Sequence, residues 1–162
     1  MIIPRRQQHI DEDFMHQALA LAESAGRHGE VPVGALLVQE GQILGSGQNR
    51  CVMDHDPSAH AEVLAVRDAA LKSRSSRLDG ATLYVTLEPC LMCCGILLQA
   101  RIARLVFGAR EPRTGGVVSI HEALRLPGVD HHVAITEGVL AEQGAALMQT
   151  FFRELRQSGS AQ

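Results

Sequence analysis

The segment Thr86-Leu87-Glu88-Pro89-Cys90-Leu91-Met92-Cys93-Cys94, together with His60-Ala61-Glu62 upstream, organises the rest of this chain. Cys90 and Cys93 are three positions apart, which places two side chains on one face of a helix. The apolar run 81–87 is typical of a buried strand. The two thiols are therefore predicted at a strand-to-helix junction, where α/β proteins commonly place their chemistry.

The same residues are candidate metal ligands. Imidazole and thiolate groups both bind zinc well, so His60, Cys90 and Cys93 are predicted to hold one Zn²⁺. A structural zinc site usually has four protein ligands, whereas a catalytic site keeps one position for water. Three candidate ligands therefore favour a catalytic site.

Glu62 is the candidate proton carrier. It follows His60 by two residues, which on a regular helix separates the two side chains by about 200°, at about 100° per residue. The side chains converge only at the first turn of a helix, and Asp56-Pro57-Ser58 supplies the expected start signals. A carboxylate beside the metal can take the proton of a water, and this is the role predicted for Glu62.

The two motifs carry a resemblance. His60-Ala61-Glu62 and Pro89-Cys90-Leu91-Met92-Cys93 resemble the H-x-E and P-C-x-x-C signature of zinc-dependent nucleobase deaminases. Over most of its length the sequence resembles the bacterial tRNA-specific adenosine deaminases of the cytidine/deoxycytidylate deaminase superfamily. The resemblance extends through residues 31–35, 107–110 and 151–153. The resemblance implies a three-layer α/β/α cytidine-deaminase-like fold, one Zn²⁺ per subunit and a homodimer. It also implies hydrolytic conversion of adenosine to inosine at the wobble position of a tRNA anticodon stem-loop.

The family pattern also implies substrate contacts. Asn49 is implied to touch the target nucleotide, Glu111 and Arg113 the anticodon loop, and Phe152 and Arg156 the RNA near the carboxy terminus.

Two further cysteines need separate treatment. Cys94 shares a helical face with Cys90, so spacing alone leaves it open as a ligand. The family pattern favours Cys93 as the ligand and Cys94 as a packing residue. Cys51 is expected to bind nothing.

The rest of the chain alternates between strand and helix patterns, which predicts an α/β fold with a mixed sheet and helices on both faces. Glu40-Gly41 is the predicted turn of a hairpin, and 109–130 is predicted as mostly surface loop. Strands are predicted at 32–38, 42–47, 81–87, 105–108 and 132–136, and helices at 11–28, 58–71, 89–104 and 138–156.

Length and composition limit the domain organisation and the setting. The 162 residues, 46% of them hydrophobic, fit one deaminase domain, with flexible ends expected at 1–8 and 157–162. No secretory signal or membrane-spanning run is visible, and four cysteines without such a signal favour a reducing cytoplasm. A formal net charge of −3 argues against indiscriminate coating of nucleic acid.

A nucleic-acid substrate then requires a local basic patch. If they share one face, six arginines could hold phosphates without reading sequence. They are Arg101, Arg104, Arg110, Arg113, Arg153 and Arg156.

Two alternatives remain at this point. The same motifs are compatible with a deaminase of free bases or nucleosides, of the guanine or cytosine type. A non-catalytic, zinc-stabilised RNA-binding domain is the other alternative, and Glu62 beside only three ligands argues against it.

Overall fold

A mixed five-stranded sheet forms the centre of the protein, as the sequence predicts. The computed structural model describes residues 2–159. The strands are β1 (Gly34–Gln39), β2 (Gln42–Gln48), β3 (Thr82–Leu87), β4 (Arg104–Ala109) and β5 (Ala134–Glu137), in the order β2-β1-β3-β4-β5. Strand β1 is antiparallel to both neighbours, whereas β3, β4 and β5 run parallel. The carboxyl ends of β3 and β4 therefore meet at one edge.

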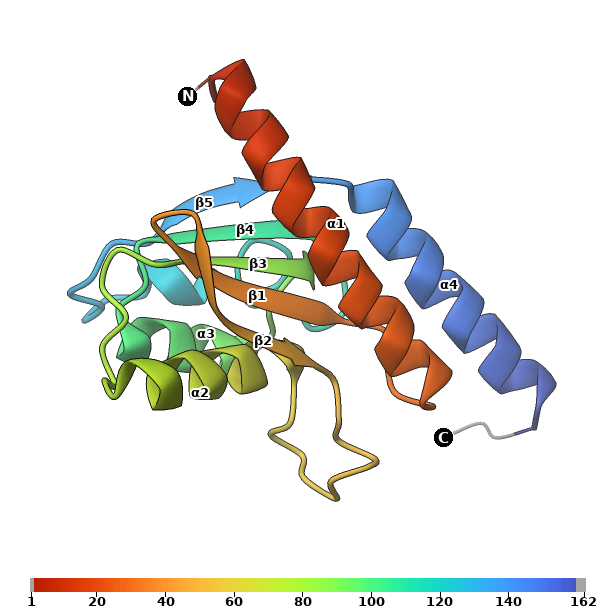
Figure 1. Ribbon diagram of the computed structural model, residues 1–162. Coiled ribbons are helices and arrows are strands. Elements are labelled where there is room, and N and C mark those ends of the chain that lie inside the picture. Colours follow the sequence, from red (N-terminus) through yellow and green to blue (C-terminus); the bar gives the residue numbers. More distant parts are fainter. Residues whose placement is uncertain (1, 160–162) are drawn as a thin grey trace.

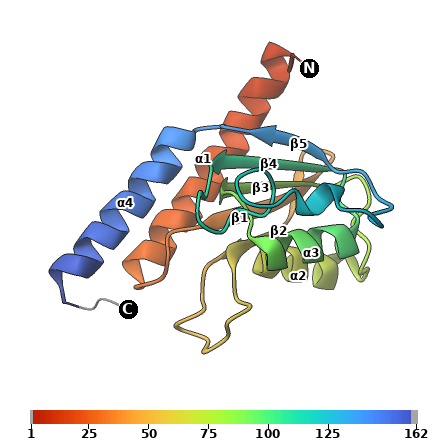
Figure 2. The same ribbon diagram turned by 180° about the vertical axis from the view of Figure 1, so that it is seen from behind.

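Helices cover both faces of the sheet, which confirms the three-layer α/β/α architecture (Figures 1 and 2). Helices α2 and α3 pack on one face, and α1 and α4 pack on the other. Their bounds are α1 (Arg5–Arg27), α2 (Ala61–Ser73), α3 (Leu91–Ala100) and α4 (Ala141–Gln157), with a short 3₁₀ helix at Ala123–Arg125. Within residues 2–159, none of the helices has the length and apolar character needed to cross a membrane.

The central strands are apolar on both faces because each face is covered. In β3, Leu83 and Val85 belong to the core beneath α2 and α3, whereas Tyr84 between them belongs to the core beneath α1. Successive strand residues point to opposite faces, so a continuous apolar run supplies both cores.

Helix α2 lies unusually close to the sheet because β2 carries glycines beneath it. A Cβ atom at Gly45 or Gly47 would overlap the backbone oxygens of Ala65 and Ala61. The absence of side chains here brings the start of α2, with His60 and Glu62, down onto the sheet. The glycines therefore help to position the predicted site.

Some element ends differ from the predictions. Helix α1 begins at Arg5, so the expected flexible segment 1–8 is wrong for residues 5–8, where Gln8 N donates to Pro4 O at 3.0 Å. At the other end, α4 continues to Gln157, and residues 160–162 lie outside the described part of the chain. The predicted turn at Glu40-Gly41 is confirmed, and both residues have positive φ, as a two-residue hairpin requires.

A buried ion pair ties α1 to the sheet. Arg104 donates to both carboxylate oxygens of Asp11, at 2.8 and 2.7 Å, and the Tyr84 hydroxyl donates to the same carboxylate at 2.8 Å. Burial acts to raise the pKa of Asp11, but hydrogen bonds from Arg104, Gln7 and Tyr84 outweigh it and hold that pKa below its usual value. Arg104 is thus committed to the fold.

Replacing Asp11 with asparagine is expected to lower the free energy of unfolding at neutral pH by about 3–5 kcal/mol, because Arg104 is left without its partner. The pKa of Asp11 is lowered on folding, so its contribution is present above the unfolded pKa of about 4 and is lost as pH falls through the folded value. Urea denaturation of both proteins between neutral pH and pH 3 checks this. Asp79→Asn, in an exposed pair with Arg77, is the control and should change little.

Candidate active site

Three side chains from two helix starts form a metal-ligand cluster. His60 is the N-cap residue of α2, and Cys90 is the N-cap residue of α3. Cys93 lies in the first turn of α3. His60 Nδ1 is 3.6 Å from Cys90 Sγ and 3.5 Å from Cys93 Sγ, and the three ligand atoms all lie within 4.8 Å of one another.

These distances fit zinc. Zn–S bonds of about 2.3 Å and Zn–N bonds of about 2.1 Å, at tetrahedral angles, place the nitrogen and sulfur about 3.6 Å apart. The observed separations of 3.6 and 3.5 Å match that value. One nitrogen and two sulfur donors also suit zinc chemically. Within residues 2–159 the cluster offers three protein ligands, so a tetrahedral zinc would have one corner for a non-protein ligand.

The two thiols differ in acidity. A hydrogen bond from Cys93 lowers the pKa of Cys90 to about 4, against the opposing effect of burial. Cys93 is the proton donor of the pair, and its pKa is raised. Metal binding displaces that proton, because zinc binds thiolates.

Glu62 lies directly beside the cluster, as the first-turn argument requires. It is buried, with 4% of its surface exposed, and its Oε2 lies 3.4 Å from Cys93 Sγ. Burial raises the pKa of the Glu62 carboxyl. A carboxyl with a raised pKa next to a metal site is suited to accept and return protons.

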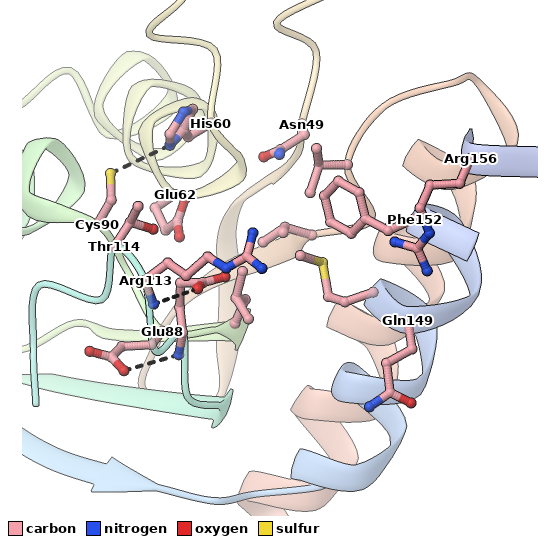
Figure 3. Close-up of a pocket in the computed structure, with 15 residues that line it drawn as sticks. Asn49, His60, Glu62, Glu88, Cys90, Arg113, Thr114, Gln149, Phe152 and Arg156 are labelled. Carbon is pink, nitrogen blue, oxygen red and sulfur yellow. Dashed lines mark hydrogen bonds between the residues drawn. The ribbon is translucent and has the colours of Figure 1, made fainter. Parts of the chain in front are cut away.

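A cavity of about 600 Å³ opens over this cluster. Figure 3 shows His60, Glu62 and Cys90 on one side of the cavity and Phe152 and Arg156, from α4, on the opposite side. The structure brings all five predicted substrate-contact residues to this cavity, namely Asn49, Glu111, Arg113, Phe152 and Arg156. Apolar side chains complete the wall: Val31, Val33, Leu87 and Met148.

Asn49 joins the cavity to the start of α2. Its Oδ1 accepts a hydrogen bond from Ala61 N at 2.8 Å, which satisfies one of the free N–H groups at the helix start. Asn49 N donates to Val33 O at 3.2 Å. Asn49 thus fixes the strand-to-helix loop next to His60.

Comparison with known proteins agrees with this geometry. A sequence profile of the cytidine and deoxycytidylate deaminase zinc-binding region matches residues 8–109. A tRNA-specific adenosine deaminase of Haemophilus influenzae is 44% identical over 149 residues, which cover 91% of this chain and 86% of that protein. The chain belongs to the tRNA-specific adenosine deaminase family. The zinc cofactor predicted from the sequence is the metal of the zinc-binding region that the profile describes.

Other relatives give the same assignment. The tRNA-specific adenosine deaminase of Bacillus subtilis is 39% identical, over 93% of this chain and 94% of its own. A solved structure from work on A-to-I editing by tRNA:A34 deaminases has a TM-score of 0.81 at 40% identity, covering 83% of this chain and 98% of that one. A guanine deaminase from Nitrosomonas europaea has a TM-score of 0.73 at 25% identity, covering 86% of this chain and 83% of that one.

The six arginines do not all serve the cavity. Arg104 is held by Asp11, Arg110 pairs with Glu137 at 2.7 Å, and Arg101 pairs with Asp130 at 3.5 Å. Only Arg113 and Arg156 of the predicted set line the cavity. The condition that all six share one face could not be judged from the sequence, because pairing partners far along the chain are invisible there.

Two smaller differences concern α3. The predicted helix 89–104 begins at Pro89, whereas α3 begins at Leu91 with Cys90 as its N-cap residue, so the predicted start is wrong by two positions. Cys94 is fully buried in the core and lies outside the ligand cluster. Burial raises the pKa of Cys94 to about 12. Cys51 also lies outside the cluster.

Sequence reasoning missed several cavity residues. Thr114, Met148 and Gln149 line the cavity, and so does Glu88, which is only 2% exposed. Glu88 had a visible signal, because an acidic residue directly after a buried strand must find hydrogen-bond donors.

Proposed function

We propose that this protein hydrolytically deaminates adenosine to inosine at the wobble position of a tRNA anticodon loop. The observation that carries the proposal is the His60–Cys90–Cys93 cluster with buried Glu62, which opens into a cavity lined by the five residues predicted to contact the substrate. The relatives named tRNA-specific adenosine deaminase support the choice of substrate.

The proposed chemistry divides the work between the metal and Glu62. When bound, zinc lowers the pKa of a water and so supplies a nucleophile at neutral pH. Glu62 accepts the proton of that water and returns it to the departing amine, so that a C–O bond replaces the C6–N bond and ammonia leaves. His60, Cys90 and Cys93 would hold the metal beside Glu62.

The cavity wall suits a base taken out of its stack. Val31, Val33 and Phe152 offer apolar surface to the faces of the base. The side-chain oxygen of Asn49 accepts the hydrogen bond from Ala61 N, and within residues 2–159 its side-chain nitrogen makes no hydrogen bond. We therefore assign that nitrogen as a donor to an acceptor atom of the purine.

Two arginines at the cavity are proposed to hold the RNA backbone. Within residues 2–159, Arg113 and Arg156 form no salt bridge, so their charges are available to phosphates. Such contacts position RNA without reading its sequence.

Arg156→Ala is expected to weaken binding of an anticodon stem-loop and to lower the salt dependence of binding. Loss of one phosphate contact should reduce the slope of log K against log salt by about 0.7–1. Fluorescence anisotropy across a KCl series measures both quantities. Arg77→Ala, at the loop between α2 and β3, is the matched control; an equal change in its slope would contradict the assignment.

The assembly and the setting are also proposals. A homodimer is supported by exposed apolar side chains around α3, where Leu91 is 52% exposed and Leu126 50% exposed, and both line one shallow groove. Sedimentation equilibrium tests the dimer. A cytoplasmic setting follows from the proposed tRNA substrate and from the four free cysteines.

The deciding experiment offers the zinc-loaded protein an unmodified tRNA anticodon stem-loop, and separately free guanine, cytosine and adenosine. Inosine in the stem-loop is the expected result. The similarity to a guanine deaminase makes the free base the proper comparison. Ammonia released from free bases with no inosine in RNA would replace the proposal by the free-base alternative.

A further inference from the structure

Glu88 is a buried carboxylate with an unusual set of partners. Within residues 2–159 it forms no salt bridge, and its charge is instead surrounded by N–H and O–H donors of one segment. Its Oε2 accepts from the backbone N–H groups of Val117, Val118 and Ser119 at 3.1, 3.0 and 3.0 Å. Its Oε1 accepts from Glu111 N at 3.2 Å and from the Ser119 hydroxyl. All of these donors lie 23–31 residues further along the chain.

The segment that Glu88 holds, residues 111–119, has no helix or strand. It carries Glu111, Arg113 and Thr114 to the cavity. The segment also contacts the residues between β3 and α3, one of which is the ligand Cys90. Gly116 N donates to Pro89 O at 2.8 Å, and Gly115 forms a β-bridge with Cys90. In Figure 3 the Glu88 carboxylate bonds to the backbone beneath Arg113, away from the metal-ligand cluster.

We propose that Glu88 is a positioning residue for the substrate. It fixes segment 111–119 against the residues that carry Cys90, so that Glu111 and Arg113 meet the nucleotide in register with the metal centre. Glu88 itself does not act on the reacting atoms. The inference rests on the proposed function, since it concerns how that substrate is held.

The pattern of donors explains why a carboxylate is needed and predicts which contact an amide would lose. A glutamine has one acceptor oxygen, which three N–H groups would hold on the Oε2 side. Its amino group would then face Glu111 N–H, donor against donor, while the Ser119 hydroxyl can turn to accept. Glu88→Gln should therefore release the Glu111 end of the segment and leave the Ser119 end attached.

The first test measures zinc content and steady-state kinetics of Glu88→Gln on the anticodon stem-loop. Zinc content should equal that of the wild type. KM should rise about tenfold with kcat changed less than about threefold, because the lost interaction is one of substrate binding. Loss of zinc, or a fall in kcat at unchanged KM, would overturn the assignment.

A double-mutant cycle separates positioning from general stability. If Glu88 acts through Arg113, then the Glu88→Gln, Arg113→Ala double variant should have nearly the KM of Arg113→Ala alone. Additive effects would show that Glu88 acts elsewhere.

Amide hydrogen exchange supplies a readout that does not depend on activity. In the wild type, the amides of Glu111 and Val117–Ser119 should exchange slowly although they belong to no helix or strand. In Glu88→Gln only the Glu111 amide should become fast. Rapid exchange at all four positions in the wild type would refute the proposal that Glu88 fixes this segment. This measurement needs only the wild type, so it remains decisive if Glu88→Gln fails to fold.

The outcomes distinguish this inference from the proposed function. A wild-type protein that makes no inosine in the stem-loop would remove the proposed function, while the exchange pattern would still report on Glu88. A wild type that makes inosine, with a Glu88→Gln variant of unchanged KM, would remove only the inference.

Discussion

Replacing Glu62 with glutamine is expected to leave zinc binding intact and to lower kcat for deamination by about 10²–10⁴-fold. Glutamine has nearly the same size and shape, so it fits the buried position that Glu62 occupies beside the cluster. It lacks the ability to take a proton from water or to return one to the leaving amine. Glu62 is not one of the three metal-ligating residues, so zinc binding should not depend on its ability to carry a proton.

Single-turnover kinetics on the stem-loop, with zinc measured in the same samples, is the appropriate assay. Glu40→Gln makes the same chemical change at the exposed hairpin turn and is the control, which should behave as the wild type. A Glu62→Gln protein with near-normal turnover would exclude Glu62 from the mechanism.

Cys93→Ala is expected to abolish both zinc binding and activity, whereas Cys94→Ala should retain both. Removing Cys93 leaves only His60 and Cys90 at the cluster, too few protein ligands for a stable zinc site. Cys94 offers no replacement, because its side chain is fully buried in the core between α3 and the sheet. The two variants are matched, since each removes one sulfur from adjacent positions of the same helix.

Metal analysis after dialysis against a weak chelator, followed by the stem-loop assay, tests this pair. Cys94→Ala removes a buried sulfur from the core and should lower the free energy of unfolding by about 1 kcal/mol. If Cys94→Ala lost the metal and Cys93→Ala retained it, then the ligand assignment drawn from the P-C-x-x-C pattern would be reversed.

The parts of the fold that follow local rules were predictable. The runs that became β3 and β4 are apolar throughout because both faces of the sheet are covered, and a helix between them makes them parallel. Spacing within one helix turn limited the cysteine ligands to Cys90 with either Cys93 or Cys94, and the resemblance to the deaminase family favoured Cys93, which lies in the cluster. The predicted start of helix α1, at residue 11, lies too far along the chain, because the helix begins at Arg5. Its first turns carry no apolar stripe that would reveal them.

The features that were missed depend on distant partners. Asp11 and Arg104 are 93 residues apart, and neither residue type reveals in sequence that it is paired in the interior. The same holds for Glu88, whose donors arrive from a loop with no regular pattern of its own. Long-range hydrogen bonding, and not local propensity, decided which charged residues serve the fold and which line the cavity.

Two ligands of the cluster, His60 and Cys90, are N-cap residues, so α2 and α3 both begin at the same point. Each helix start carries a partial positive charge of about half an elementary unit from its aligned peptide dipoles. Of the acidic groups gathered here, Cys90 alone has a lowered pKa, about 4, whereas the pKa values of Cys93 and Glu62 are raised. The backbone thus favours the Cys90 thiolate at the junction of the two helices, before any cation contributes.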